Sequence, residues 1–430
     1  MNDLQTKAQK LGIIMPEISS EQINDQIKPV LRQMEEVGIG LNCAGLNNLA
    51  DKLTIRLKEL EGQIYQAVGA EFNISSPIQM AEMLFDRLKL PTTGLKRTKS
   101  GVSTAASELS KISSEHIVIA LILEYRELSK LISTYLRPLP LLVDENSRLH
   151  TTYSMDTSTG RLSSSEPNLQ NIPIKGTYGE DIRAAFVASP GCKLIVADYS
   201  QIELRIVACL AKDKAMIEAF GRDEDIHAQT AAAIFNINMA DVTAAERRVA
   251  KAVNFGIVYG QTPYGLSQAL GIEVTAAATY IKNYFDLHTG IMDYINDMIS
   301  AAHTDGYVET IFGTRRYLPN INSSVRYIAE GEERMAINMP VQGTAAEILK
   351  LAMIEMSKRL ELINDKRKNK GHDCPARMLL TVHDEIVLEA PVEMAEEVGK
   401  ILKDTMENVI IMCVPIKVSL GIGDNWAKAK

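Results

Sequence analysis

Two stretches in which an apolar run ends at a carboxylate constrain the fold of this chain most strongly. Residues 193–205 read KLIVADYSQIELR, and their apolar run predicts a buried strand that ends at Asp198. Residues 377–389 read RMLLTVHDEIVLE, which predicts a β-hairpin whose polar turn carries Asp384. Each pattern alone is weak. In a chain with 54 acidic residues, a pair spaced like Asp198 and Glu203 arises often by chance, and every sheet needs polar turns.

The two aspartates become informative if both strands belong to one sheet. Asp198 and Asp384 would then stand at strand ends of the same sheet. Mg²⁺ favours a few carboxylates together with substrate phosphates. Two such ions about 3.5–4 Å apart can hold the attacking and leaving oxygens of a phosphoryl transfer. Together the stretches predict a magnesium site for phosphoryl transfer.

A third stretch, residues 243–260, predicts a helix with an ordered polar face. It reads TAAERRVAKAVNFGIVYG, and Thr243 with Glu246 forms a capping box that starts the helix. Two cations and then two aromatics recur at every fourth position, close to one face: Arg247, Lys251, Phe255 and Tyr259. A surface helix whose aromatic end packs in the core would show the same pattern. The order of the residues favours a nucleotide site, with cations at the triphosphate and aromatics at sugar and base.

Composition is that of an ordinary soluble globular protein, with 46% hydrophobic and 23% charged residues. The longest apolar run, residues 117–123, is too short to cross a bilayer, which needs about 20 residues. No targeting signal is evident. The scattered cysteines show no metal spacing and are expected to be reduced core thiols: Cys43, Cys192, Cys209, Cys374 and Cys413.

The net charge of −8 argues weakly against nucleic acid, but binding depends on where positive charge lies. Basic residues cluster at four places, Lys96/Arg97/Lys99, Arg247/Arg248/Lys251, Arg315/Arg316 and Lys366/Arg367/Lys368/Lys370. Any one of these clusters is also explained as a solvated face.

The order of predicted elements alternates between helical and mixed segments. Helices are expected over residues 21–90, 113–136 and 203–305, and again after the turn at 310–318 as far as residue 358. Basic loops or turns are expected over 91–101, 310–318 and 364–373. Strands and loops are expected over 143–200, and strands over 376–390. This layout predicts a chain that leaves and re-enters one mixed α/β platform.

Five motifs of the chain resemble those of the family A DNA polymerases, the bacterial DNA polymerase I type. DYSQIELR, RRVAKAVNFGIVYG and VHDE are similar to motifs A, B and C of that family. TGRLSSSEPNLQNIP at 159–173 and ERMAINMPVQGTAAEI at 333–348 match as well, while EFNISSPIQMAEMLF and LILEYRELSKLISTY resemble its thumb. The resemblance runs from about residue 20 to the end of the chain.

The resemblance implies an α+β fold of the right-hand polymerase type, with an antiparallel-sheet palm, helical fingers and a helical thumb. Its segments would be a lead-in over 1–20, the thumb with the helix leading into it over 21–142, the palm over 143–205 and 336–430, and the fingers over 206–335. The implied partners are primer–template DNA and dNTPs, with no membrane. The implied state is a monomer in the cytoplasm of a bacterium, or of a host if a phage or plasmid encodes it.

The implied activity is template-directed addition of dNTPs to a primer 3′-hydroxyl with release of pyrophosphate. Two Mg²⁺ ions, for which Mn²⁺ can substitute, would be held by Asp198 and Asp384 with the Tyr199 carbonyl, and Glu385 would contribute less. Lys251 is implied to be catalytic, as the proton donor to pyrophosphate.

The resemblance also assigns the nucleotide site. Its residues would be Gln201, Glu203, His227, Arg247, Lys251, Phe255 and Tyr259. Glu203 resembles the steric gate that excludes a ribose 2′-hydroxyl. Phe255 occupies the position where phenylalanine disfavours dideoxynucleotides, and Tyr259 would stack near the templating base.

DNA contacts are implied in two places. The terminal base pairs would be followed, mostly from the minor groove, by Arg161, Gln170, Asn171, Arg334, Asn338, Gln342 and His383. Minor-groove acceptors are nearly common to all Watson–Crick pairs, so these contacts check pair shape. Duplex phosphates would be gripped from the thumb, in a salt-dependent way, by Lys96, Arg97, Lys99 and Lys130.

Three departures from the family pattern matter. Only about 20 residues precede the expected thumb, so no 3′–5′ exonuclease or 5′ nuclease domain is expected in this chain. Thr381 stands where the family commonly has glutamine, which puts minor-groove checking in doubt. The basic insert 364–373 is expected to be a solvated loop rather than a DNA contact.

Two other functions fit parts of the pattern. A single-subunit RNA polymerase shares the palm but should lack the gating carboxylate, so Glu203 argues for deoxynucleotides. A catalytically idle nucleic-acid-binding module would not need every metal and phosphate residue to be present. The role in replication or in repair stays open.

Overall fold

A computed structural model describes residues 3–99, 101–173, 176–368 and 374–430. The chain divides into two compact units. The larger unit comprises Met1–Gly38, Thr151–Asn171 and Ala188–Lys430, and the smaller unit comprises Ile39–His150 and Ile172–Val187. Each unit is described by itself.

The larger unit is built on a four-stranded antiparallel sheet in the order β11–β12–β8–β13. Its strands are β8 (Cys192–Tyr199), β11 (Arg377–Val382), β12 (Glu385–Pro391) and β13 (Val418–Gly423). The strand expected from the apolar run before Asp198 is therefore confirmed, as is the hairpin around His383 and Asp384. β8 and β12 pair so that Asp198 lies opposite Glu385.

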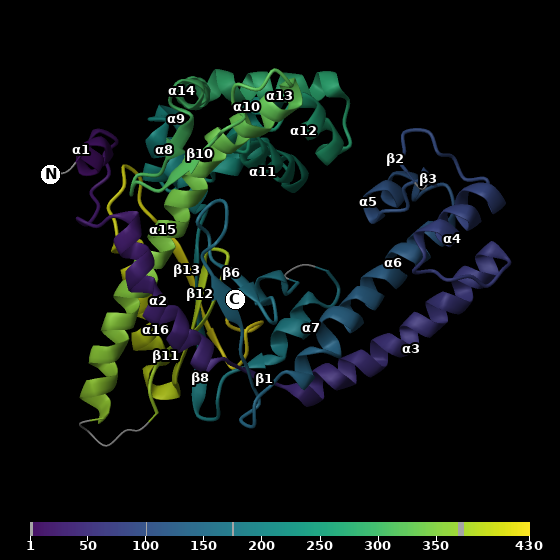
Figure 1. The fold of residues 1–430 in the computed structure, drawn as a ribbon, viewed down its shortest axis with the longest axis horizontal. Helices are drawn as coiled ribbons and strands as arrows, with labels where there is room; N and C mark the ends of the chain where they lie inside the picture. The colour runs from purple at the N-terminus through teal and green to yellow at the C-terminus, as the bar shows by residue number, and fades with distance from the viewer. Residues whose placement is uncertain (1–2, 100, 174–175, 369–373) are drawn as a thin grey trace. The chain divides into compact units, whose positions relative to one another are not determined.

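Three helices pack on or beside this sheet: α2 (Ser20–Val37), α15 (Arg326–Lys368) and α16 (Ala395–Asn408) (Figure 1). α16 buries Val398, Leu402 and Met406 on one face, which is the spacing of an amphipathic helix. That face packs on β8 and β13. Gly399 favours the close approach, because a Cβ there would lie 3.3 Å from methyl groups of Leu420 and Ile422 of β13, which is tighter than most side-chain contacts.

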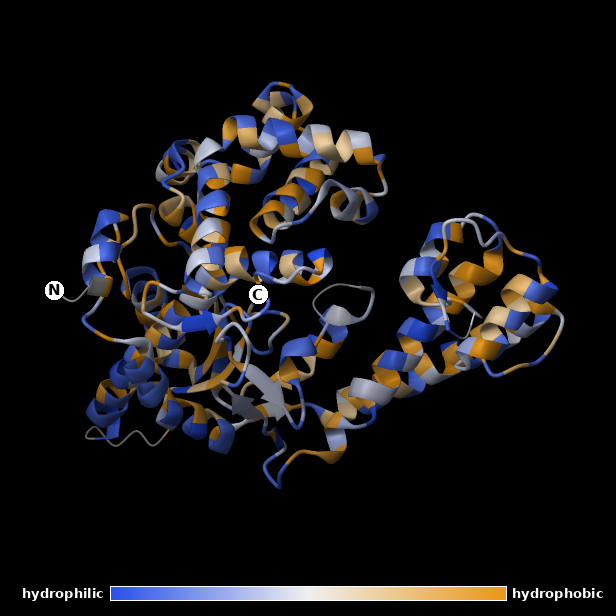
Figure 2. Cartoon of the chain, turned by 45° about the horizontal axis from the view of Figure 1, so that its top comes forward, coloured by the Kyte–Doolittle hydropathy of each residue, from blue (hydrophilic) through white to orange (hydrophobic). Residues whose placement is uncertain are grey.

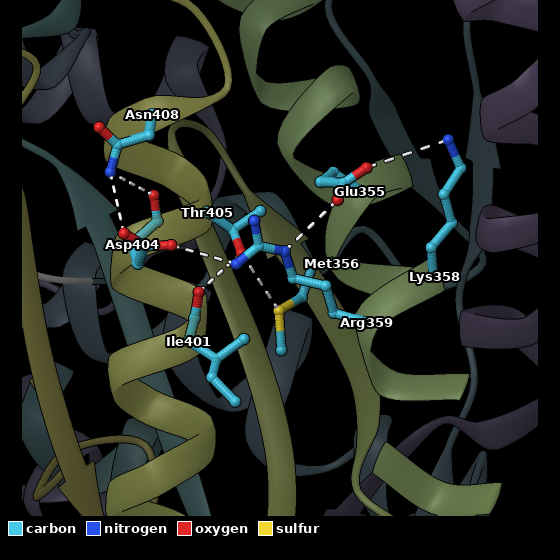
Figure 3. Close-up of polar contacts among 8 residues, drawn as sticks. All are labelled: Glu355, Met356, Lys358, Arg359, Ile401, Asp404, Thr405 and Asn408. Carbon is cyan, nitrogen blue, oxygen red and sulfur yellow. Dashed lines mark hydrogen bonds and ion pairs between the residues drawn. The ribbon is translucent and has the colours of Figure 1, made fainter. Parts of the chain in front are cut away.

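The outer contact between α15 and α16 is polar. Figure 3 shows Arg359 of α15 between Glu355, at 3.4 Å, and Asp404 of α16, at 3.1 Å. These side chains are partly exposed, and ion pairs of this kind contribute little stability. The sheet and helices are held together mainly by the buried apolar residues between them.

Seven helices follow β8 and gather around the N-terminal part of α15 (Figure 1). They are α8 (Ile202–Leu210), α9 (Lys214–Gly221), α10 (Ile226–Phe235), α11 (Ala244–Val258), α12 (Pro263–Leu270), α13 (Val274–Leu287) and α14 (Thr289–Asp305). The helical prediction for 203–305 is confirmed. The remaining short elements of the larger unit are α1 (Asp3–Lys10), β5 (Thr152–Ser154), β6 (Ser163–Ser165), η5 (Leu169–Asn171), η6 (Met239–Asp241), β9 (Tyr307–Glu309), β10 (Arg315–Tyr317) and η7 (Val392–Met394).

The smaller unit is mainly helical. Its helices are α3 (Cys43–Val68), α4 (Pro77–Ala81), η1 (Glu82–Arg87), α5 (Ala106–Leu109), η2 (Ser110–Ile112), α6 (Ile117–Leu131), η3 (Ile132–Leu136), η4 (Leu139–Leu141) and α7 (Gly179–Ala184). Its strands are β1 (Ile39–Leu41), β2 (Arg97–Thr98), β3 (Gly101–Val102), β4 (Arg148–Leu149) and β7 (Phe186–Val187). α3 packs along α6, and the basic stretch 91–101 contributes to the β2–β3 hairpin.

Two expectations about local structure were wrong. The helical stretch predicted over 21–90 is interrupted by β1, where a Cβ on Gly40 would lie only 2.6 Å from the carbonyl oxygen of Val187. The tight strand pairing there requires glycine. The insert 364–373 is not a loop at its start, because α15 continues to Lys368; residues 369–373, which include Lys370, lie outside the described residues.

The expectation of five reduced thiols was also wrong. Cys209, near the end of α8, is bonded to Cys413, just before β13, whereas Cys43, Cys192 and Cys374 are free. The bonded pair is separated by 204 residues in the sequence, so no spacing pattern could reveal it. The fold brings the two together because α8 follows β8 directly in the chain, and β13, which begins shortly after Cys413, pairs with β8.

No helix among the described residues is long and apolar enough to cross a membrane. Polar residues are interspersed along the long helices of both units, as Figure 2 shows.

The sheet core of the larger unit predicts the effect of truncating a central side chain. Ile195 is fully buried in β8, so Ile195→Ala should lower the free energy of unfolding by about 2–5 kcal/mol through lost burial and the cavity left behind. Urea unfolding can be followed by the fluorescence of Trp426, the only tryptophan, which is buried in the same unit. Ile411→Ala, at a side chain that is 58% exposed, should change stability by less than about 0.5 kcal/mol. Equal effects of the two substitutions would contradict this packing.

Candidate active site

The candidate site begins at the ends of β8 and β12, where strand pairing brings two aspartates together. The backbone N–H of Tyr199 donates to the carbonyl oxygen of Asp384 at 3.2 Å, next to the pair formed by Asp198 and Glu385. The hairpin turn that carries Asp384 is tight, and His383 adopts a φ of 56° there. Histidine is among the residues that tolerate this left-handed region.

Burial shapes the electrostatics of these carboxylates. It raises the pKa of Asp384 to about 6; Arg161 acts against this shift, and Glu203 and Asp198 add to it. Burial also raises the pKa of Asp198. A raised carboxyl pKa means that the ionised form is unfavourable as it stands, and a bound cation would relieve that cost.

These carboxylates fit a magnesium site that substrate phosphates complete better than a metal site formed by protein ligands alone. Within the described ranges, no cluster of three or more His, Cys, Asp or Glu side chains could hold a metal ion by itself. Mg²⁺ is typically bound through one or two carboxylates plus substrate phosphates. Glu385, expected as a lesser metal ligand, accepts a hydrogen bond from the Trp426 indole at 2.6 Å and pairs with Lys430.

Glu203 lies close to this pair because the chain turns sharply after β8. Gln201 has a φ of 56°, which lets the chain pass from the strand into α8 within three residues. The Glu203 side chain is buried, and its two oxygens accept hydrogen bonds from Arg161 and from the Tyr259 hydroxyl. Burial and the Glu203 charge raise the pKa of Tyr259, which keeps the phenol protonated. The carboxylate is thus fixed in one position.

Helix α11 presents the predicted cations and aromatics. The capping box of Thr243 and Glu246 is present, and the prediction of a helix start is confirmed. Arg247 pairs with Asp225, the N-cap of α10, at 2.5 Å. The rings of Phe255 and Tyr259 are stacked, with their centroids 6.4 Å apart. Tyr259 follows directly after the helix, and both side chains are partly buried against the core.

His227 on α10 faces the same helix. It is almost fully buried, and its Nδ1 lies 3.1 Å from the Asn254 amide of α11. Its ring lies 6.0 Å from that of Phe255. Burial lowers its pKa to about 4, and the charges of Arg247 and Lys251 add to the shift. His227 is therefore neutral at physiological pH.

The expected DNA contacts of the larger unit lie on several elements. Arg334, Asn338 and Gln342 recur every fourth residue on α15 and so share a face. Gly260 permits the chain after α11 to approach this helix, because a Cβ there would lie 3.0 Å from Cγ of Arg334. Arg161 contacts Glu203, while the Gln170 amide donates to a backbone carbonyl at 3.1 Å, and Asn171 ends η5.

Thr381, the departure from the family pattern, is buried in β11. Its hydroxyl donates to the carbonyl oxygen of Glu385 at 3.0 Å, and its N–H donates to the Tyr153 hydroxyl at 3.1 Å. The Thr381 hydroxyl is therefore hydrogen-bonded within the sheet, and the side chain does not reach the surface.

The cations expected to grip duplex phosphates lie in the smaller unit. Lys96, Arg97, Lys99 and Lys130 are exposed. Lys130 lines a cavity of 580 Å³ together with Arg126 and several hydroxyl side chains. Cations among hydroxyl donors are suited to an anion such as phosphate.

Sequence reasoning missed two residues at the site, Trp426 and Lys430. Both contact Glu385 from the last segment of the chain. That segment, GDNWAKAK, shows no periodic pattern, and no local signal in the sequence could have placed it at the carboxylates.

Comparison with known proteins identifies the family. The family described as DNA polymerase family A matches residues 43–428. The chain belongs to DNA polymerase family A. It is 45% identical over 412 residues to DNA polymerase I of Deinococcus radiodurans, covering 95% of this chain and 42% of that protein. It is 44% identical over 412 residues to DNA polymerase I of Geobacillus stearothermophilus, covering 95% of this chain and 46% of that protein.

A solved structure supports the same assignment. The POL domain of Pol1 from M. smegmatis, in complex with DNA primer-template and dNTP, matches with a TM-score of 0.88 and 35% identity, over 99% of this chain and 73% of that one. The expected α+β right-hand polymerase fold of family A is therefore confirmed. This chain spans less than half the length of the two DNA polymerase I relatives.

The buried His227 of this family A chain gives a pH prediction. In an NMR titration, His227 should show a pKa of about 4, whereas His303, held by Asn322 and Glu333, should titrate above 6.5. Because the unfolded protein takes up the proton first, protonation of His227 should cost stability as pH falls from 6.5 towards 4. A His227 pKa at or above 6.5 would contradict the burial described here.

Proposed function

We propose that this chain is a DNA-directed DNA polymerase, which adds dNTPs to a primer 3′-hydroxyl under template direction and releases pyrophosphate. The observation that carries the proposal is the pairing of β8 with β12, which puts Asp198 opposite Glu385 and joins the N–H of Tyr199 to the carbonyl oxygen of Asp384. Family membership and the likeness to a polymerase domain with bound DNA and dNTP support it.

Asp198 and Asp384 would hold two Mg²⁺ ions, with the Tyr199 carbonyl as a further oxygen ligand, and Mn²⁺ would substitute. When bound, the ions supply charge stabilisation to the attacking and leaving oxygens of the displacement. The raised pKa values of both aspartates fit this role, because a carboxylate that is costly to ionise alone gains most from a cation. The residues themselves position the ions through the fixed register of the sheet.

The incoming nucleotide would lie along α11. Arg247 and Lys251 offer positive charge to the triphosphate, and Lys251 would give a proton to the leaving pyrophosphate. Arg247 must exchange its ion pair with Asp225 for a phosphate, which charge-assisted bidentate contacts favour. His227 is neutral and would contribute a hydrogen bond rather than a charge.

Sugar selection would depend on Glu203. Its carboxylate is buried and fixed by Arg161 and Tyr259, so it cannot move aside at low cost when a 2′-hydroxyl enters. Phe255 and Tyr259 would line the sugar and base positions. This fixed carboxylate also favours a DNA polymerase over the single-subunit RNA polymerase alternative.

Primer–template DNA would contact both units. The minor groove would be contacted by the α15 face that carries Arg334, Asn338 and Gln342, and by His383. Arg161, Gln170 and Asn171 would make further contacts to the same base pairs. Thr381 takes no part because it is buried, so the check of pair shape depends on the other side chains. The exposed cations of the smaller unit would bind duplex phosphates, and affinity should fall as salt rises.

Substitution of the paired aspartates tests the proposed activity. With Mg²⁺ and a primed template, the wild-type chain should extend the primer with dNTPs. Asp198→Ala and Asp384→Ala should each lower the extension rate by a factor on the order of 10³ or more, because the charge stabilisation supplied at the metal site is worth several kcal/mol. Gel-based primer extension measures the rate, and fluorescence anisotropy of labelled DNA checks that binding is largely retained.

Asp424→Ala provides the matched control for these variants. Asp424 is an acidic residue of the same unit, paired at 2.5 Å with Lys193, and its loss should leave extension unchanged. A wild-type chain that adds no nucleotide would refute the proposed activity. Robust extension by either aspartate variant would refute the assignment of the two aspartates.

Glu203→Ala should admit ribonucleotides, because it opens the space that a 2′-hydroxyl needs. The ratio of kcat/KM for rNTP to that for dNTP should rise by at least about tenfold, which corresponds to 1.4 kcal/mol or more. Tyr259→Phe is the control, since it removes one hydrogen bond to Glu203 while the carboxylate stays in place. If neither variant gains rNTP use, the gate lies elsewhere; if both gain equally, the position of the carboxylate matters more than its bulk.

A further inference from the structure

The last residue of the sequence lies at the carboxylates of the candidate metal site. The Lys430 ammonium contacts Oε2 of Glu385 and lies 3.6 Å from Oδ2 of Asp198. Glu385 is 2% exposed, so this is not an ordinary surface ion pair. A buried carboxylate without a partner would be strongly unfavourable.

The position of Lys430 is built into the sheet. A Cβ on Gly421 of β13 would lie 2.2 Å from the carbonyl oxygen of Ala429, and one on Gly423 would lie 2.7 Å from the carbonyl carbon of Lys428. Only glycine at these two strand positions permits the final segment to lie against β13. Ala429 is fully buried there, and its N–H donates to the carbonyl oxygen of Asn425 at 3.1 Å.

Trp426 fixes the other oxygen of the same carboxylate. Its ring is fully buried, and its Nε1 donates to Oε1 of Glu385 at 2.6 Å. Both oxygens of Glu385 are therefore directed to the final segment of the chain. The Glu385 carboxylate therefore holds the Lys430 ammonium in place, and this ammonium lies beside Asp198.

We propose that Lys430 is a resident counter-cation of the Asp198–Glu385 carboxylates, a positioning residue that holds them together and competes with the divalent cation bound through Asp198. The inference rests on the proposed function, since it concerns the same metal site. An ammonium beside Asp198 repels a divalent cation and occupies Glu385, which would otherwise be a further oxygen ligand. Lys430 thus sets how much Mg²⁺ the site requires before DNA and nucleotide add their own phosphates.

Lys430→Met removes the charge and keeps much of the side-chain volume. Mn²⁺ binding to the DNA-free full chain can be measured by the electron paramagnetic resonance signal of free Mn²⁺, without any reaction. The dissociation constant of Lys430→Met should fall by about threefold or more, the size expected for removing one partly exposed like charge. Lys430→Arg keeps the charge and should bind Mn²⁺ like the wild type.

Lys428→Met is the matched control, because Lys428 is an exposed lysine two residues away whose loss should not change Mn²⁺ binding. An unchanged or weaker affinity in a folded Lys430→Met chain would overturn the proposal. If Lys430→Met fails to fold, Lys430→Gln removes the same charge; failure of both to fold would show a purely structural role and would also overturn it. A wild-type chain that neither binds Mn²⁺ nor extends a primer would instead refute the proposed function.

Discussion

The candidate site depends on one interaction above all, the antiparallel pairing of β8 with β12. This pairing sets Asp198 opposite Glu385 and joins Tyr199 to the carbonyl of Asp384. Because side chains alternate along a strand, a slip of one residue would turn each carboxylate to the other face of the sheet. The buried residues between sheet and α16 fix the register, so the core of the larger unit and the geometry of the site have the same cause.

Local features of the site could be predicted from the sequence because each is encoded within about 15 residues. The apolar run before Asp198 gives β8, the capping box at Thr243 starts α11, and the fourth-residue spacing puts Arg247, Lys251 and Phe255 close to one face of that helix. The resemblance to family A supplied the order of these parts, and the comparisons confirm the family and the fold.

Other features could not be predicted because they join segments far apart in the sequence. The bond between Cys209 and Cys413 spans 204 residues, and β1 forms only because β4 and β7 lie on either side of it. The contacts of Trp426 and Lys430 with Glu385 depend on the close approach allowed by two glycines in β13. The roles assigned to Asp198, Asp384 and Glu385, and to the nucleotide and DNA contacts, all stay predictions.

The burial of Asp384 makes the stability of the fold depend on pH. Burial raises the pKa of Asp384 from 3.8 to about 6, so the folded protein holds a proton that the unfolded protein releases, and stability falls as pH rises through that range.

The paired strands are proposed to place Asp198 and Asp384 on the same divalent cations. Anomalous diffraction from crystals of the chain with Mn²⁺, primed DNA and a non-hydrolysable dNTP tests it most directly. Manganese peaks should lie within ligand distance of both aspartates, and peaks that contact neither, or only one of the two, would contradict the proposed metal site.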